Sequence, residues 1–153
     1  MKLIYFITFI LCGNLCLSQI NINQFNQSFK DNPKPILIYF YTDWCGICKI
    51  QEKQIGNNPI VKQQLNKDVY YLKFDGETDQ SITFFNQNYI TNSTKYRKAN
   101  HSFLTAFVPY QEINYPLWII LNKDLEIVGK YNGLIKPNKL EKIINQLKKD
   151  AIK

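Results

Sequence analysis

Two cysteines three residues apart, Cys45 and Cys48, are the residues of this chain best suited to chemistry. Two thiols at this spacing can bind a metal ion, close a local disulfide, or exchange electrons with a disulfide of another protein. They follow the apolar run ILIYFYT (36–42) and open a helical pattern that continues to about Gly56. We therefore expect Cys45 at the point where a buried strand ends and a helix begins.

A helix start should make Cys45 the more reactive of the two thiols. Unpaired backbone N–H groups and the positive end of the helix dipole favour a thiolate at that position. Cys48 lies about one helical turn further along, so the two side chains are neighbours within reach of a disulfide. Cys45 is therefore the predicted nucleophile and Cys48 its partner.

The other two of the four cysteines, Cys12 and Cys16, lie in the N-terminal stretch MKLIYFITFILCGNLCLSQ. Lys2 and the apolar run after it are typical of a secretory signal peptide, and the run is short for a membrane span. Small residues suit cleavage after Ser18, so we expect residues 1–18 to form a signal peptide that is removed. An uncleaved membrane anchor is the alternative.

The expected mature chain, residues 19–153, has the length of one domain with a sizeable core. The whole sequence carries a formal net charge of +7. However, the lysines near its C-terminal end alternate with apolar residues, as on the solvent-facing side of an amphipathic helix. We therefore expect no binding of nucleic acid. We also expect a monomer.

The remaining pattern predicts an α/β domain with a central mixed sheet. The sheet needs a parallel crossover followed by an antiparallel pair, with helices flanking it. The expected elements are a helix before Pro33, a strand at 36–42, a helix at 45–56, a helix from 58, a strand at 69–75, strands at 116–122 and 125–133, and a helix from Pro137.

Two motifs resemble those of the thioredoxin family. WCGICK (44–49) at a strand-to-helix junction is similar to the family's active-site motif, and Tyr115-Pro116 before an apolar strand is similar to its cis-proline signature. The resemblance covers about residues 34–150 and implies a thioredoxin-like fold.

The same resemblance implies roles for residues around the cysteines. In the family the cis proline lies against the cysteine pair, keeps metals away, and leaves the backbone of the preceding residue free to pair with an extended substrate. It thus implies a redox-active Cys45–Cys48 disulfide and substrate contacts from Trp44, Tyr115 and Pro116. No metal site and no cofactor are implied.

This sequence departs from the family at two buried positions. Many thioredoxins place an acidic residue and a lysine where this chain has Tyr39 and Tyr71, and use them to relay a proton to the second cysteine. Deprotonation of Cys48 must then use water, Lys73 or Asp43, and we expect water.

A second departure is the length of residues 76–115, where one helix and two short loops need only about 24 residues. This enlarged insertion resembles an elaboration of secreted thioredoxin-like proteins of Bacteroidetes-type bacteria, which implies a periplasmic or secreted location. Its aromatic residues are spaced as on helical stretches and are expected in the core. They are Phe84, Phe85, Tyr89, Phe103 and Phe107, with Asp75 and Glu77 before them given no role.

The single histidine, His101, also lies in the enlarged insertion. We expect it at a helix start, packed beside Phe103 and Leu104. A proton donor or metal ligand near the cysteines is the alternative.

Three functions remain open from the sequence. The first is a secreted thiol–disulfide oxidoreductase that acts on protein thiols and disulfides, expected to be a reductase supplied by a membrane electron donor. The second is a metal-binding module, which would need His101 and a carboxylate besides the two cysteines. The third is an interaction domain with a fixed disulfide, although such a short loop stabilises little.

Overall fold

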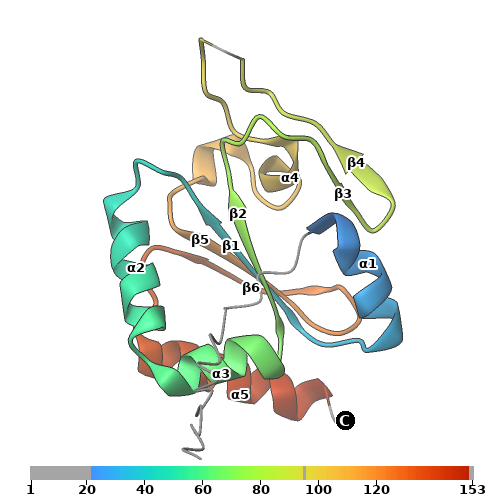
Figure 1. Cartoon of the computed structure of the whole chain (residues 1–153), viewed down its shortest axis with the longest axis vertical. Coiled ribbons are helices and arrows are strands. Elements are labelled where there is room, and N and C mark those ends of the chain that lie inside the picture. The colour runs from blue at the N-terminus through green and yellow to red at the C-terminus, as the bar shows by residue number, and fades with distance from the viewer. Residues whose placement is uncertain (1–21, 95, 152–153) are drawn as a thin grey trace, which may run out of the picture.

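The computed structural model describes residues 22–94 and 96–151, in which helices pack on both faces of a four-stranded sheet (Figure 1). The order of the strands across the sheet is β2-β1-β5-β6. Their bounds are β1 (Ile36–Tyr41), β2 (Tyr70–Asp75), β5 (Leu117–Leu121) and β6 (Ile127–Asn132). β1 pairs with β2 in parallel and with β5 antiparallel, and β5 pairs antiparallel with β6. The mixed α/β sheet expected from the sequence is confirmed.

β1 is the central strand because its continuous apolar run can be buried on both sides. Ile36, Ile38 and Phe40 belong to the core on one face of the sheet. Leu37 and Tyr39 belong to the core on the other. Only the last residue of the strand is partly exposed, and the chain then leaves the sheet toward the cysteines.

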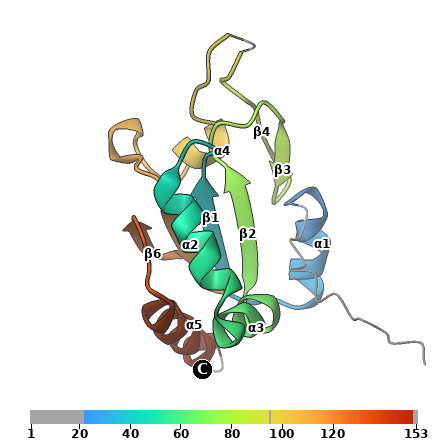
Figure 2. The same cartoon turned by 60° about the vertical axis from the view of Figure 1, so that its left-hand side comes forward.

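Three helices cover the face of the sheet that carries Tyr39, and Figure 2 shows α2 lying across the strands on this side. They are α2 (Gly46–Gly56), α3 (Pro59–Lys67) and α5 (Pro137–Ala151). The opposite face is covered by α1 (Ile22–Asp31), by a hairpin of β3 (Ile82–Phe84) and β4 (Gln87–Tyr89), and by the short α4 (Ser102–Thr105). A 3-10 turn, η1 (Tyr110–Glu112), precedes β5.

The enlarged insertion corrects one expectation. Phe84, Phe85 and Tyr89 were expected on helical stretches, but they lie in or beside the β3–β4 hairpin. Its two central residues, Phe85 and Asn86, have positive φ angles of 47° and 63°, as a tight hairpin turn requires. Asn26 of α1 accepts the backbone N–H of Phe85 at 2.8 Å, so a tertiary contact holds the turn.

The expected burial of the insertion's aromatic residues is confirmed. Phe84 and Phe103 are buried, and Phe85, Tyr89 and Phe107 pack against the same core.

The predicted signal peptide lies outside the described residues, and so do Cys12 and Cys16. Its cleavage therefore stays a prediction. Within residues 22–94 and 96–151, no helix has the length and apolar character needed to cross a membrane.

Candidate active site

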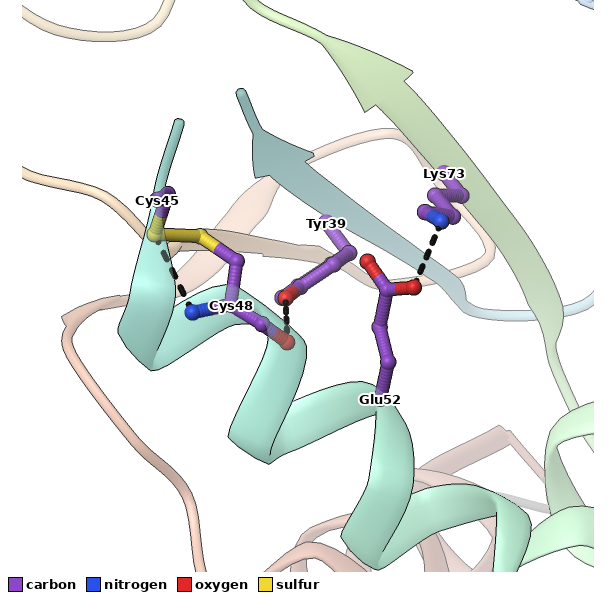
Figure 3. A network of polar contacts seen from close by, with 5 residues as sticks. All are labelled: Tyr39, Cys45, Cys48, Glu52 and Lys73. Atoms are coloured by element: carbon purple, nitrogen blue, oxygen red, sulfur yellow. Dashed lines mark hydrogen bonds and ion pairs between the residues drawn. A yellow bond between two sulfur atoms is a disulfide. The ribbon is translucent and has the colours of Figure 1, made fainter. Parts of the chain in front are cut away.

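Cys45 is the N-terminal capping residue of α2. The chain reaches it through a turn in which the Cys45 N–H donates to the carbonyl of Thr42 at 3.1 Å. The Cys45 sulfur in turn accepts the backbone N–H of Cys48 at 3.1 Å (Figure 3). An N–H aimed at this sulfur is the arrangement that stabilises negative charge on it.

Cys45 and Cys48 form a disulfide, with an S–S distance of 2.03 Å and a Cα–Cα distance of 5.2 Å. Both residues are buried in this oxidised form, with 4% of Cys45 and 1% of Cys48 exposed. Exposure alone therefore does not separate their roles. The difference between them is that Cys45 caps the helix and accepts its N–H.

Tyr39 belongs to the same buried cluster as the two cysteines. Its hydroxyl donates to the backbone carbonyl of Cys48 at 3.1 Å (Figure 3). Burial raises the pKa of Tyr39, and the charge of Glu52 raises it further. The phenol therefore stays protonated at neutral pH and acts as a fixed donor to the first turn of α2.

Glu52 and Lys73 form an ion pair beyond Tyr39, with 2.9 Å between their charged atoms (Figure 3). Lys73 also lies over the ring of Tyr41, 4.2 Å from its centroid. Burial likewise raises the pKa of Tyr71. Tyr39 and Tyr71 thus belong to or pack against the buried cluster that contains the cysteines. Lys73, one of the proton acceptors considered for Cys48, is paired with the Glu52 carboxylate.

Two aromatic side chains lie edge to face next to the disulfide. The ring centroids of Trp44 and Tyr115 are 5.9 Å apart, with an interplanar angle of 86°. Trp44 is 66% exposed, whereas Tyr115 is half-buried and packs against the core that contains both cysteines.

Each of these two aromatic residues has a hydrogen-bond partner in the enlarged insertion. The indole N–H of Trp44 donates to a carboxylate oxygen of Glu77 at 2.9 Å. The hydroxyl of Tyr115 donates to the side-chain oxygen of Asn100 at 2.9 Å.

Pro116 follows Tyr115 through a cis peptide bond. It is buried, and its carbonyl accepts the N–H of Gly133 at 2.7 Å. Tyr115, the residue before it, lies beside Trp44 although the two are far apart in the sequence.

His101 has a structural setting. It caps α4, as expected for a helix-start residue, and it is fully buried. Its Nδ1 accepts the N–H of Phe103 at 3.1 Å, so Nε2 carries the proton and donates to the carbonyl of Gln80 at 3.1 Å. Burial lowers the pKa of His101. Both ring nitrogens are thus occupied, and neither is available as a metal ligand or proton donor to the cysteines.

Among the described residues, no three or more His, Cys, Asp or Glu side chains group together in a way that could hold a metal ion. The chemistry that the site offers is that of two thiols and a disulfide.

Four residues near the site had no role in the sequence-based interpretation: Glu52, Gly76, Glu77 and Asn100. Each acts through a partner that is distant in the sequence, so no local spacing pattern indicates it. The Trp44–Glu77 pair, for example, spans 33 positions.

A family model described as a thioredoxin-like domain matches residues 23–148. A thioredoxin from Thermus thermophilus has a similar structure, with a TM-score of 0.55, 15% identity, and coverage of 82% of this chain and 83% of that chain. A disulphide isomerase from Xylella fastidiosa Temecula1 is also similar, with a TM-score of 0.51, 17% identity, and coverage of 79% and 83%. At these identities the two structures show the fold alone.

One curated relative matches a shorter segment. The thiol:disulfide interchange protein DsbD of Pectobacterium atrosepticum is 34% identical over 47 residues. This match covers 31% of the present chain and 8% of that protein.

Proposed function

This chain belongs to the thioredoxin-like domain family, and we propose that it is a thiol–disulfide oxidoreductase that acts on protein disulfides through Cys45 and Cys48. The observation that carries the proposal is the position of Cys45. It caps α2 at the end of the central strand, and its sulfur accepts the N–H of Cys48. The short match to a thiol:disulfide interchange protein supports the same reaction class.

The proposed reaction has two exchange steps. In the reduced protein, the Cys45 thiolate attacks one sulfur of the partner's disulfide, forms a mixed disulfide, and releases the partner's first thiolate. The Cys48 thiolate then attacks the Cys45 sulfur. The Cys45–Cys48 disulfide forms, and the partner's second thiolate leaves. Two electrons pass from the dithiol to the partner, whose two thiolates take up the protons.

Substrate contact is assigned to Trp44, Tyr115 and Pro116. Trp44 offers an exposed apolar surface beside the disulfide. The backbone of Tyr115, before the buried proline, is proposed to pair with an extended segment of the substrate.

We further propose that the protein is a reductase, periplasmic or secreted after removal of residues 1–18, and supplied with electrons by a membrane donor. The signal-peptide pattern supports the location, as does the resemblance of residues 76–115 to secreted Bacteroidetes-type proteins. An oxidising compartment would reoxidise the dithiol, which is why a donor is needed. We expect one domain over residues 19–153, acting as a monomer.

Equilibration of the protein with glutathione redox buffers tests this proposal. We expect the Cys45–Cys48 disulfide to open and close reversibly, with a midpoint on the reducing side of the glutathione couple. A disulfide that stays closed under reducing buffer would contradict the reaction. A midpoint close to those of strong oxidants would overturn the direction but leave the reaction class. Stoichiometric zinc on the reduced protein would favour a metal-binding module instead.

A further inference from the structure

Side chains of the enlarged insertion accept hydrogen bonds from both aromatic residues that flank the disulfide, Trp44 and Tyr115. We propose that Glu77 and Asn100 are positioning residues that keep Trp44 and Tyr115 edge to face beside the Cys45–Cys48 disulfide, and so set the rate of exchange with protein substrates. This role rests on the proposed oxidoreductase function and deepens it, because it gives residues 76–115 a part in substrate recognition.

Trp44 shows why such positioning is needed. Its side chain is 66% exposed, so packing alone does not restrict it to one orientation. Two contacts do so: the indole N–H donates to Glu77 at 2.9 Å, and the ring meets the ring of Tyr115 edge to face. A hydrogen bond to a charged acceptor is stronger than one between neutral groups. Glu77 therefore fixes which face of the indole a partner meets.

Tyr115 is held in a similar way at the other end of the pair. Its hydroxyl donates to Asn100 at 2.9 Å. Its ring also lies directly against Gly76, where a Cβ atom would come within 2.8 Å of the ring carbons. Because Gly76 has no side chain, the ring fits into this space, and its hydroxyl can reach the loop that carries Asn100.

Close to these contacts, the start of the insertion is joined to the segment around Asn100. The N–H of His101 donates to the carbonyl of Gly76 at 2.7 Å, and the carbonyl of Asn100 accepts from the side chain of Asn92 at 3.1 Å. The hydroxyl of Ser93 donates to the carbonyl of Glu77 at 3.1 Å. Glu77 and Asn100 are thus parts of one hydrogen-bonded frame.

This arrangement has a selective consequence. The ring of Tyr115 is directed to Gly76 and Asn100, which leaves its backbone as the part proposed to pair with a substrate, and the exposed indole of Trp44 adds an apolar surface. An extended polypeptide uses both surfaces, but a small disulfide needs only access to the sulfur. Loss of the frame should therefore slow exchange with protein disulfides and spare exchange with small ones.

Matched variants of the full-length protein test this inference. Glu77→Leu and Asn100→Leu remove the acceptors, whereas Glu77→Gln and Asn100→Asp keep an acceptor oxygen in place. For each leucine variant we expect reduction of a protein disulfide, such as those of insulin, to fall about tenfold, as for one lost hydrogen bond to a positioned group. The acceptor-keeping variants should stay within about twofold of the parent. All should keep the parent rate with glutathione disulfide.

The fluorescence of Trp44 gives a readout that a general loss of stability would not move. The chain has two tryptophans, and the other, Trp118, is fully buried. In the folded Glu77→Leu variant we expect iodide to quench Trp44 more strongly than in the parent, with Glu77→Gln resembling the parent. A Trp44→Phe variant provides the Trp118 background. When Glu77→Leu is added to Trp44→Phe, the rate of protein-disulfide reduction should fall little further, because the indole N–H that Glu77 binds is already absent.

The outcomes separate this inference from the proposed function. If the parent does not react with glutathione disulfide, the proposed function fails. If the parent reacts but both leucine variants reduce the protein disulfide at the parent rate, the positioning role is overturned and the function stands. Equal slowing with protein and small disulfides would also overturn it. Glu112→Leu, an exposed change in the same insertion, controls for nonspecific effects.

Discussion

At the scale of single residues, the asymmetry between Cys45 and Cys48 predicts the order of the proposed exchange steps. The Cys45 sulfur accepts a backbone N–H at the start of α2, and no comparable donor to Cys48 occurs in the described part of the chain. In the reduced protein, iodoacetamide at mildly acidic pH should therefore modify Cys45 well before Cys48. Peptide mass spectrometry after brief labelling measures the ratio, and preferential labelling of Cys48 would reverse the assignment.

The same asymmetry predicts which single variant traps a partner. Cys48→Ser leaves the attacking thiol but nothing to resolve the product, so mixed disulfides with protein substrates should accumulate. Cys45→Ser should give none, and it serves as the matched control. Nonreducing gels of the two variants after incubation with an oxidised protein substrate distinguish these results.

Tyr39 should affect the stability of the fold and not proton transfer at the cysteines, because its phenol stays protonated. Tyr39→Phe removes the donor to the carbonyl of Cys48, which should lower the free energy of unfolding by about 1 kcal/mol. The pH profile of Cys45 alkylation should not gain or lose a titrating group. Tyr41→Phe keeps a ring under Lys73 and is the control. A shift of the Cys45 profile in Tyr39→Phe would show that the phenol takes part in proton transfer.

His101 links stability to pH. Burial lowers the pKa of His101 in the folded state, so the unfolded chain binds a proton more readily. The stabilisation is complete above the unfolded pKa of about 6.5 and is lost as the pH falls toward the folded pKa, by at most about 1.4 kcal/mol per pH unit.

Urea unfolding at about pH 7.5 and about pH 5.5 measures this slope. The oxidised protein should be used, since His101 is then the only side chain with an ordinary pKa in that interval. His101→Asn can still cap α4 but cannot take up a proton, so its slope should be close to zero. An unchanged slope in this variant would place the titration elsewhere.

At the scale of elements, α2 is tied to the rest of the fold through a buried glutamine. Gln51 is fully buried, accepts the N–H of Ile135 at 2.7 Å, and donates to its carbonyl at 3.0 Å. Gln51→Leu would leave two backbone groups without partners and should cost about 2 to 4 kcal/mol of unfolding free energy.

Gln54 on the same helix provides the comparison. Its buried side-chain oxygen has no hydrogen-bond partner among the residues that the structure describes. Gln54→Leu should therefore change the unfolding free energy by less than about 1 kcal/mol. Chemical denaturation of both variants measures the difference, and equal losses would contradict the role of the Gln51–Ile135 pair.

The elements also show how far the sequence could predict this protein. The central strand, the helix after Cys45 and the final strands could be predicted, because each has a local pattern of apolar residues long enough to set its type. The helical expectation for Phe84 and Phe85 was wrong. Tertiary contacts from α1 hold Phe85 at a positive φ that its own propensity disfavours.

The candidate site also contains residues that could be predicted from the sequence and residues that could not. Cys45 and Cys48 could be proposed from their spacing, and Trp44 from the resemblance of WCGICK (44–49) to the thioredoxin motif. Glu77 and Asn100 could not, since each bonds a residue on a different element and neither belongs to the cysteine motif or the cis-proline motif. Hydrogen bonds between distant segments depend on the folded geometry, which periodicity does not encode.

At the scale of the whole molecule, electron transfer and stability are thermodynamically linked. A protein that reduces other disulfides must favour its own, so closing Cys45–Cys48 should stabilise the fold. We expect the oxidised form to unfold at higher denaturant than the reduced form, by about 1.4 kcal/mol for each 30 mV by which the folded potential lies below that of the unfolded chain. Denaturation of both redox forms measures it. A more stable reduced form would indicate an oxidant.

The long path of the chain between β2 and β5 has a consequence for how such a protein can evolve. β1 lies between β2 and β5, with Ile36 paired to Tyr70 on one side and to Leu121 on the other. Residues 76–116 connect β2 to β5, so they leave the sheet on one side of β1 and return to it on the other. Doubling the length of such a loop costs only about 0.6 kcal/mol in closure entropy. β5 is buried along its whole length, which fixes its register whatever the loop contains. Selection can therefore lengthen the exposed parts of this segment, and with them the surface proposed to meet a partner, while the sheet and the cysteines are inherited unchanged.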